Sequence, residues 1–464
     1  MDRELVKQNI YTRLSQVERL LTDMLPSEEE YVDIHKYSQY VREDSQGLEI
    51  WTDVFRAALK KEKAVYIPKA EQPYYIDGSV LIPSGRHIRA DDDAVIRQVK
   101  GVRVLMFRNE HTVDGTYHPP DTENRDYNIS ITGGKWEESH ASRAGYGKSG
   151  MYDDDRSFYG VSSCMLFNNI ENLSLRNMAF ACTAGFAVQA AEMKNVIFEN
   201  ITFQNCFADG LHINGNSENL IIRNIAGEVG DDLVALNMYD WENSSVNFGP
   251  VRTVLCENLS LAPSSRYKAL RISPGVHWFE DGTSVNCTAE EFIVKNVSGI
   301  HTFKLYLQTP KYRVGEEPRS KEVGSGDNLF FEDITIDLTG PVDPFEEYLT
   351  SHKVLGAFAG FEIGTNIGSI SFENINIRLY REKYPMSFLA CVGPKSIRTK
   401  DGWEIFDPYI DCKVQNVYMK NIVVNGEQAE DIMPYIYEIT FDDVYDDGLA
   451  VGRGVFERIE AERN

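Results

Sequence analysis

Three aspartates between Phe207 and Asn237 have the residue type and the spacing for acid/base chemistry. Asp209 begins a short run of alternating apolar residues, and Asp231 and Asp232 begin a second run, 22 residues later (209 to 231). If one structural repeat is about that long, the three carboxylates stack on one face, on rungs about 4.8 Å apart. Carboxylates that close cannot all stay ionised cheaply, so at least one pKa should rise. The result would be one protonated acid beside one ionised base.

The elements that position these aspartates are predicted from a unit that recurs along the chain. An asparagine or another polar residue precedes an alternating apolar run at Asn128, Asn172, Asn195, Asn219, Thr253, Glu291, Asn328, Ser369 and Asn416. The spacing is 23 and then 24 residues (172 to 195 to 219), and it later lengthens to between 34 and 47. Such short strands bury their apolar faces only when units stack, and the shortest spacing fits one coil of a parallel β-helix. A β-sandwich fits less well, and a propeller blade needs about 40 to 50 residues.

The segment before the repeats is predicted to be helical. Apolar residues recur there near one helical face at Leu5, Ile10, Leu14, Val17, Leu20 and Leu21. A short amphipathic helix is expected at 50–60, followed by extended runs at 65–67, 74–76, 80–82 and 87–89. The chain is therefore divided into an N-terminal helical extension or cap, 1–47, and a β-helix domain with loop insertions, 48–464. The fold class is all-β, a solenoid with an N-terminal helical cap.

Charge and composition limit the classes of partner. With 47 basic and 71 acidic residues the formal net charge is −24, which disfavours nucleic acid and anionic membranes as partners. An anionic substrate is still compatible, because a local basic cluster can dominate its own cleft. No apolar run approaches the roughly 18 residues of a membrane span. The N-terminus lacks the pattern of a secretory signal, so a cytoplasmic location is expected, or secretion if a leader has been removed.

The cysteines and the remaining motifs predict neither a metal site nor a cofactor. Seven cysteines are scattered along the chain without a CxxC pair, which favours reduced, buried thiols. There is no glycine-rich phosphate loop and no metal-ligand cluster with recognisable spacing. The expected partner is an oligosaccharide or polysaccharide, and the N-terminal extension leaves a homo-oligomer open.

Three stretches carry a resemblance to a known family. Residues 52–97, TDVFRAALKKEKAVYIPKAEQPYYIDGSVLIPSGRHIRADDDAVIR, resemble the N-terminal cap of pectin-lyase-like right-handed β-helices, and NISITGGKWEES from Asn128 resembles a coil of that family. FADGLHI and GDDLVALN resemble the polygalacturonase motifs NTDG and QDDCIAI of family-28 glycoside hydrolases, at the same separation. The fold resemblance runs from about residue 50 to 425 and the motif resemblance from Asp209 to about Gln308. It implies a right-handed parallel β-helix.

The resemblance also implies roles for the aspartates. Family-28 enzymes invert, with the first residue of the aspartate pair as general acid; carried over, Asp231 is the acid, while Asp209 and Asp232 position and deprotonate water. The substrate implied is a plant-type or uronic-acid-containing oligosaccharide or polysaccharide. Alternatives on the same fold are a fructan-active enzyme and a polysaccharide lyase or epimerase, in which Arg271 or Lys304 abstracts a proton and the aspartates bind calcium. A non-enzymatic carbohydrate-binding or tail-fibre β-helix is a third class, which the short acidic C-terminal end disfavours.

Strand alternation selects further residues that are expected to face a substrate. Leu211 and Ile213 should point inward, which turns His212 and Asn214 outward. The same argument turns Gln189 outward on the preceding coil and Asn237 outward on the following one. His212 is expected to bond sugar hydroxyls or to orient a carboxylate.

The next coils depart from the family pattern. The GHG motif is absent, and its place falls in SSRYKALRISPG, which offers Lys268 and Arg271. The RIK motif has two candidate counterparts, LRIS with Arg271 and FKLYLQT with Lys304 and Tyr306; the coil count favours Lys304. A cation here is expected to bind a sugar carboxylate or to pair with the aspartates.

Insertions between the strands add aromatic residues and length. Trp241 and Tyr239 are candidates for stacking on a sugar ring, and so are His277 and Trp278. The long loops at 238–249, 274–286 and 310–326 are expected to border the cleft and could restrict it to the end of a glycan chain.

Overall fold

The computed structural model describes residues 2–102, 104–112, 123–140, 152–153, 156–157, 163–240, 245–265, 268–279, 281–300, 303–306, 323–338, 358–379, 386–391, 412–438 and 454–462. They fall into two compact units. The N-terminal unit comprises residues 11–233 and 243–247, and the C-terminal unit comprises residues 1–10, 234–242 and 248–464. Both are built from coils of a right-handed parallel β-helix, which confirms the predicted fold class.

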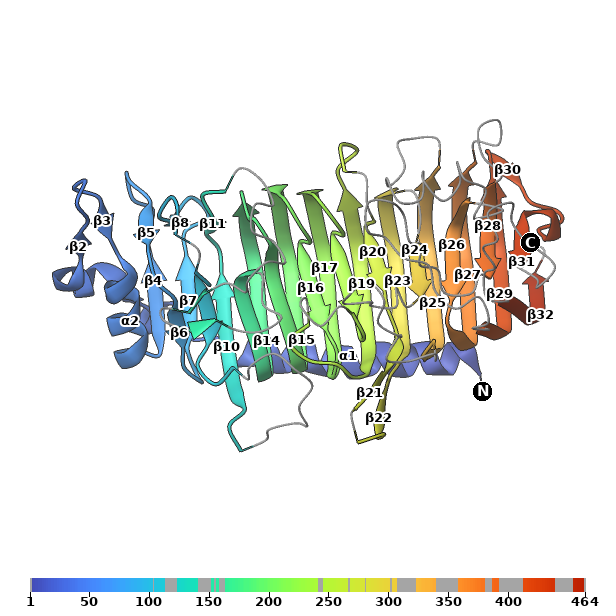
Figure 1. Cartoon of the computed structure of the whole chain (residues 1–464), viewed down its shortest axis with the longest axis horizontal. Helices are drawn as coiled ribbons and strands as arrows, with labels where there is room; N and C mark the ends of the chain where they lie inside the picture. The colour runs from blue at the N-terminus through green and yellow to red at the C-terminus, as the bar shows by residue number, and fades with distance from the viewer. Residues whose placement is uncertain are drawn as a thin grey trace. The chain divides into compact units, whose positions relative to one another are not determined.

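The N-terminal unit stacks its strands in three parallel series. Its elements are η1 (Glu28–Glu30), β1 (Val32–Asp33), η2 (Ile34–Tyr40), β2 (Arg42–Glu43), β3 (Glu49–Ile50), α2 (Thr52–Lys61), β4 (Ala64–Ile67), β5 (Tyr74–Ile76), β6 (Val80–Ile82), β7 (His87–Ala90), β8 (Val95–Gln98), β9 (Phe107–Asn109), β10 (Asp126–Thr132), β11 (Lys135–Glu137), β12 (Tyr152–Asp153), β13 (Arg156–Ser157), β14 (Ser163–Ala181), β15 (Phe186–Cys206), β16 (Leu211–Asn214) and β17 (Ser217–Val229). One series runs β4, β7, β10, β14, β15, β17, another β6, β9, β14, β15, β16, and a third β5, β8, β11, β14. Figure 1 shows β14, β15 and β17 side by side.

The C-terminal unit repeats this arrangement. Its elements are β18 (Val234–Asn237), β19 (Val251–Leu261), β20 (Leu270–Ile272), β21 (Gly275–Trp278), β22 (Ser284–Cys287), β23 (Ala289–Ile300), β24 (Phe303–Tyr306), β25 (Ser325–Asp337), β26 (Phe358–Gly364), β27 (Asn366–Arg378), β28 (Met386–Cys391), β29 (Cys412–Val424), β30 (Glu427–Gln428), η4 (Met433–Tyr435), β31 (Ile436–Glu438) and β32 (Gly454–Glu462). One parallel series runs β19, β23, β25, β27, β29, β32 and another β18, β20, β24, β26, β28, β31. The strands β21 and β22 form an antiparallel hairpin.

The recurring asparagine of the sequence repeat has a structural cause. Asn172, Asn195 and Asn219 each adopt a left-handed backbone conformation, with φ of 62°, 57° and 60°. Asparagine tolerates this conformation better than most residues. Each also donates its amide to the asparagine of the coil before it, at 2.8 Å to Asn128, 3.1 Å to Asn172 and 2.9 Å to Asn195. These four residues, Asn128, Asn172, Asn195 and Asn219, form the asparagine ladder.

In the C-terminal unit, other residues occupy the position equivalent to the ladder asparagines and bond from one coil to the next. Thr253 and Glu291 also have left-handed backbones, with φ of 56° and 60°. The Thr253 hydroxyl donates to the Glu291 carboxylate at 2.7 Å. A coil therefore accepts a different polar residue at this position when its neighbour offers a matching donor or acceptor.

The first coils are closed by aromatic packing beneath α2. Its residues Val54, Phe55, Ala58 and Leu59 are buried. Ring contacts run from Trp51 to Tyr74, from Tyr74 to Phe55, and from Phe55 through Phe107 to Trp136, all edge to face. The predicted helix at 50–60 and the four predicted extended runs are confirmed as α2 and β4 to β7.

The N-terminal helix α1 (Arg3–Asp23) buries one apolar stripe. The buried residues are Val6, Ile10, Leu14, Val17 and Leu21. Their spacing of four, four, three and four residues follows one helical face. Leu5 and Leu20 were predicted on this face but are exposed, because each precedes a stripe residue by one position and points about 100° away from it.

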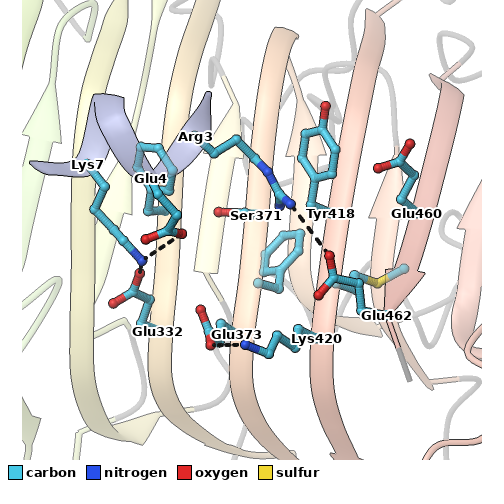
Figure 2. A pocket seen from close by; sticks show the side chains of 13 residues that line it. Arg3, Glu4, Lys7, Glu332, Ser371, Glu373, Tyr418, Lys420, Glu460 and Glu462 are labelled. Carbon is cyan, nitrogen blue, oxygen red and sulfur yellow. Dashed lines mark hydrogen bonds and ion pairs between the residues drawn. The ribbon is translucent and has the colours of Figure 1, made fainter. Parts of the chain in front are cut away.

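Ionic contacts anchor α1 within each unit. In the C-terminal unit Lys7 donates to Glu332 at 2.8 Å, and the Arg3 guanidinium lies 3.8 Å from the centre of the Tyr418 ring (Figure 2). These residues line a cavity of about 280 Å³. In the N-terminal unit Glu18 pairs with Arg223. The predicted boundary between residues 47 and 48 stays a prediction.

Two further expectations concern cysteines and membranes. All seven cysteines lie in described residues; six are buried, as predicted, and Cys182 is half-buried. In the part of the chain that the structure describes, no helix has the length and apolar character needed to cross a membrane.

Candidate active site

The N-terminal unit brings the three aspartates together. One carboxylate oxygen each from Asp209, Asp231 and Asp232 lies within 4.8 Å of the others. Asp209 and Asp232 are buried, at 4% and 2% exposed, whereas Asp231 is partly exposed. The backbone N–H of Gly210 donates to the Asp232 carbonyl at 3.0 Å, so the two motifs stand on adjacent coils. The predicted stacking of the three carboxylates at one coil's spacing is therefore confirmed; their roles are a separate question.

Glycines in both motifs permit this close approach. A Cβ at Gly210 would lie 2.6 Å from the Leu233 carbonyl oxygen, and a Cβ at Gly230 would lie 2.5 Å from the Phe207 carbonyl oxygen. Real Cβ atoms do not approach backbone that closely, so a side chain at either position would separate the coils. The glycines of ADG and GDD thus set the distance between the carboxylates.

Asp209 is held by two donors. One of its oxygens accepts the backbone N–H of Asp232 at 3.0 Å, and the other lies 2.6 Å from Nδ1 of His212. The His212 ring also stacks on Phe186, with ring centres 3.7 Å apart and an angle of 13°. Charge-assisted hydrogen bonds in a buried setting fix the orientation of a carboxylate. Asp209 is therefore oriented before any substrate arrives.

A chain of amides assigns the tautomer of His212. The Oδ1 atom of Asn214 accepts from Gln189 Nε2 and from the backbone N–H of Val246, both at 3.2 Å. The Asn214 amide nitrogen must then face His212 Nε2, which lies 3.3 Å away. An amide nitrogen only donates, so Nε2 accepts and the proton of a neutral imidazole is on Nδ1. His212 consequently donates to Asp209. We call Gln189, Asn214, His212 and Asp209 the polar column.

The residues predicted to face outward are not open to solvent. Strand register aligns Gln189 with His212, as one outward row requires. Yet His212 is 1% exposed, and Gln189 and Asn214 are fully buried. The row lies beneath other parts of the chain, so these residues do not present a free surface to a sugar in this structure.

Residues 245–247 provide part of this cover. Val246 belongs to a fully buried apolar cluster with Leu105, Leu166 and Ala191. Asn247 donates its amide to the buried carboxylate of Glu192 at 2.7 Å. Sequence reasoning placed these residues in a loop and missed their contacts, because nothing local in the sequence connects Asn247 with Glu192.

In the C-terminal unit, the predicted cation Arg271 is already paired. Its guanidinium lies 3.5 Å from Asp240 and donates to the Ser273 hydroxyl at 2.9 Å. Asn237, which is buried, donates to Asp240 at 3.0 Å. Asp240 was not singled out in the sequence, although it stands only three residues after Asn237.

Of the other predicted site residues in this unit, the structure describes only some. Lys268 is buried. The backbone of Lys304 pairs with that of Arg271, in agreement with the coil count, but the side chains of Lys304 and Tyr306 lie outside the described residues, as does all of Trp241.

The aromatic residues of the insertions pack against one another. Tyr239 is buried, with its ring centre 5.4 Å from Phe248 and 5.9 Å from His277. His277 stacks on Phe248 at 4.4 Å. Burial lowers the pKa of His277 to about 4. Tyr239 and His277 thus stabilise a loop, and neither presents a free ring face to a sugar as it stands.

The cluster of three carboxylates has a second chemical capability. Three oxygens within 4.8 Å of one another could ligate one cation. Carboxylate oxygens are the ligands that Ca²⁺ prefers. The residue types and their spacing fit such an ion, which would neutralise the cluster.

Comparisons with known proteins define the fold. No protein-family model matches the sequence, and no curated protein matches it. An iota-carrageenase complexed to iota-carrageenan fragments aligns with a TM-score of 0.52 and 12% identity, over 79% of this chain and 94% of its own. An exopolygalacturonase from Thermotoga maritima aligns with a TM-score of 0.44 and 11% identity, over 89% and 96%. The Streptococcus pneumoniae surface adhesin PfbA aligns with a TM-score of 0.42 and 12% identity, over 93% and 100%. At such identities the likeness shows the β-helix fold alone, and activity has to be argued from the site.

Proposed function

We propose that this chain is a glycoside hydrolase acting on an oligosaccharide or polysaccharide, with a uronic-acid-containing glycan as the first candidate. The observation that carries the proposal is the cluster of Asp209, Asp231 and Asp232 within 4.8 Å, in which Asp231 is the partly exposed member. Hydrolysis of a glycosidic bond requires a protonated and an ionised carboxyl group side by side. Carboxyl groups held this close favour sharing a proton, because like charges repel one another.

The geometry supports distinct roles for the three residues. Asp231 would donate its proton to the glycosidic oxygen as the bond to the anomeric carbon breaks. A water molecule would add to that carbon and lose a proton to Asp232 or Asp209, so that one water is consumed and both carboxyl groups are restored over the cycle. Asp209, held by His212 and the Asp232 N–H, would orient the water. A general acid and base of this kind each contribute about 10²- to 10⁴-fold to the rate.

The stereochemical outcome is a sharper part of the proposal. The resemblance to family-28 enzymes implies inversion. Carboxyl groups of inverting enzymes usually stand about 6.5–9.5 Å apart, and those of retaining enzymes about 5–5.5 Å. Here the nearest oxygens lie within 4.8 Å, which on spacing alone favours retention. We propose inversion, with the water held at the edge of the cluster by two aspartates, and the anomer released first by the enzyme decides the point.

The test is a screen of glycans with anomer-resolved NMR of the products. Polygalacturonate, iota-carrageenan and α-1,3-glucan form the first panel, since they are the glycan classes of the β-helix enzymes among the similar structures. New reducing ends that are lost in Asp231→Asn support the proposal. Asp92→Asn is the matched control, because Asp92, like Asp231, is followed by an aspartate but lies exposed in a turn. Turnover by Asp231→Asn at the wild-type rate would refute the assignment.

A polysaccharide lyase is the second candidate, and the ability of the carboxylates to ligate a cation favours it. In that reaction a base removes the proton at C5 of a uronic acid, and the glycosidic oxygen at C4 leaves as the double bond forms. Asp209, Asp231 and Asp232 would hold a calcium ion, whose charge would neutralise the sugar carboxylate. The products then carry a double bond that absorbs ultraviolet light. Absorbance that appears with calcium and disappears with a chelator supports the lyase, and reducing ends without absorbance support the hydrolase.

A further inference from the structure

We propose that residues 245–247 block the cleft on one side of the carboxylates, so that the enzyme acts at the end of a glycan chain. This inference rests on the proposed function and adds its mode of action. It concerns only the N-terminal unit, to which residues 243–247 and all three aspartates belong.

The segment is fixed to the coil surface at consecutive positions. The backbone N–H of Val246 donates to Asn214, and the Asn247 amide donates to Glu192. Glu192 is itself buried and accepts a second bond, at 3.1 Å, from Arg125. A buried carboxylate that is satisfied by two separate loops holds both in place. Ser245, Val246 and Asn247 are each at most 1% exposed, so the segment is closely packed and does not lie loosely on the surface.

The row of residues under this segment would otherwise form the floor of a groove. Strand register aligns Arg108, Leu166, Gln189 and His212 across four coils. None of them is more than 5% exposed. An open polysaccharide cleft on a β-helix needs such a row to be accessible, because successive sugars lie across successive coils. On this side of the aspartates the row is filled by protein.

The position of the open carboxylate then sets the mode of action. Asp231 lies one coil beyond Asp209 and is partly exposed, whereas Asp209 is buried beside the covered row. A sugar that reaches Asp231 meets protein where the next sugars toward Gln189 would have to lie. The cleaved bond must therefore be close to a chain end, and the products should be monosaccharides or short oligosaccharides of one size.

The first experiment measures where a polymer is cut. Polygalacturonate, or whichever polymer of the panel is cleaved, is followed for reducing ends and for viscosity together. End-on cleavage releases many reducing ends before viscosity falls, and one product size dominates from the start. A fall in viscosity at the first few per cent of bonds cleaved, with products of mixed length, would overturn the inference while leaving the hydrolase intact.

A variant then tests whether residues 245–247 are responsible. Replacing Ser245–Asn247 by three glycines removes the Val246 side chain and the Asn247–Glu192 bond. The viscosity loss per bond cleaved should rise, by at least several-fold. The control replaces Asp281 and Thr283, exposed on either side of Gly282 at the turn between β21 and β22, by glycine, and should cut as the wild type does. An unchanged cleavage pattern in the first variant, with its fold intact by circular dichroism, would contradict the inference.

A labelling experiment decides the same point without any substrate. Gln189→Cys and Gln204→Cys place a thiol on the same strand, β15, at a covered and an exposed position respectively. Maleimide labelling, located by peptide mass spectrometry, should be fast at 204 and at least tenfold slower at 189. The three-glycine variant should restore labelling at 189. Equal rates at the two positions in the otherwise native chain would show an open groove and refute the blockage, even if no glycan were cleaved.

Discussion

The N-terminal unit contains two stacks of polar side chains, the asparagine ladder and the polar column, and they differ in composition. In the ladder one residue type repeats on four coils and each amide donates to the one before it. In the polar column an amide, a second amide, an imidazole and a carboxylate are joined in sequence. The ladder is neutral throughout, whereas the column ends in an ionisable group beside two others.

The difference in composition indicates different purposes: the asparagine ladder stabilises the coils, whereas the polar column orients a carboxylate for chemistry. A repeated amide satisfies its own donors and acceptors at any number of coils, so it can serve stability alone. A mixed stack satisfies each group only in one order, because the imidazole must accept on one side and donate on the other. Such an order orients Asp209, and we expect substitutions in the two stacks to affect different measurements.

The largest effect is expected at Asp231, which lies in the carboxylate cluster beside the Asp209 end of the polar column. Asp231→Asn should lower kcat by about 10²- to 10⁴-fold or more, since it removes the proposed general acid. The melting temperature should stay near that of the wild type, because Asp231 is partly exposed and asparagine has nearly the same shape as aspartate. Steady-state rates and thermal unfolding of the same preparation check both statements. A large loss of stability with modest loss of kcat would place Asp231 with the structural residues instead.

A smaller catalytic effect is expected at His212, the residue of the polar column that bonds Asp209. His212→Ala removes the 2.6 Å contact to Asp209 and should lower kcat by about 10- to 100-fold with little change in KM, since His212 is buried and does not present itself to a sugar. His212→Asn can place an amide N–H near the position of Nδ1 and should recover part of kcat. A rise in KM at constant kcat would show instead that His212 contacts the substrate.

The sequence was sufficient for the parts of the molecule that repeat. A 23-residue spacing and period-two alternation predict the coil, and the coil then brings Asp209 and Asp231 together without further information. The ladder could be predicted for the same reason, since its asparagines recur at the start of each apolar run.

The sequence was not sufficient where distant segments meet. The cover over Gln189 involves Val246, which comes from an insertion of no fixed length and bonds Asn214, the partner of Gln189. The partner of Arg271 could not be predicted because Asp240 lies in such an insertion as well. Alternation gives the direction of a side chain, but the cover over it is set by tertiary packing.

Substitutions in the ladder should change stability and leave catalysis alone. Asn195→Ala removes one bond to Asn172 and one from Asn219, and it places alanine at a φ of 57°. Two hydrogen bonds at about 1 kcal/mol each, with roughly 1 kcal/mol for the left-handed backbone, predict a loss of about 2–3 kcal/mol in the free energy of unfolding. Asn195→Gly separates the two contributions, because it removes the same hydrogen bonds while glycine adopts a φ of 57° without strain. Urea denaturation measures the loss, and a matching fall in kcat of the folded enzyme would break the distinction between the two stacks.

The smallest effect is expected at His87, a buried histidine that belongs to neither stack. It faces the Ser130 hydroxyl at 2.8 Å, and burial lowers its pKa to about 4, with Glu30 opposing the shift and Arg86 adding to it. The unfolded chain, with a histidine pKa near 6.5, therefore binds more protons than the native state between about pH 6.5 and 4, so stability is lost as the pH falls through that window and is unaffected above it. His87→Asn should make the stability curve flatter there, and comparison with the wild type at each pH cancels the carboxylates that titrate at the acid end of the same range. Unfolding free energies measured at pH 7.5 and 5 check this, and an equal pH dependence in the two proteins would show that His87 charges freely in the native state, as a histidine in a solvated position does.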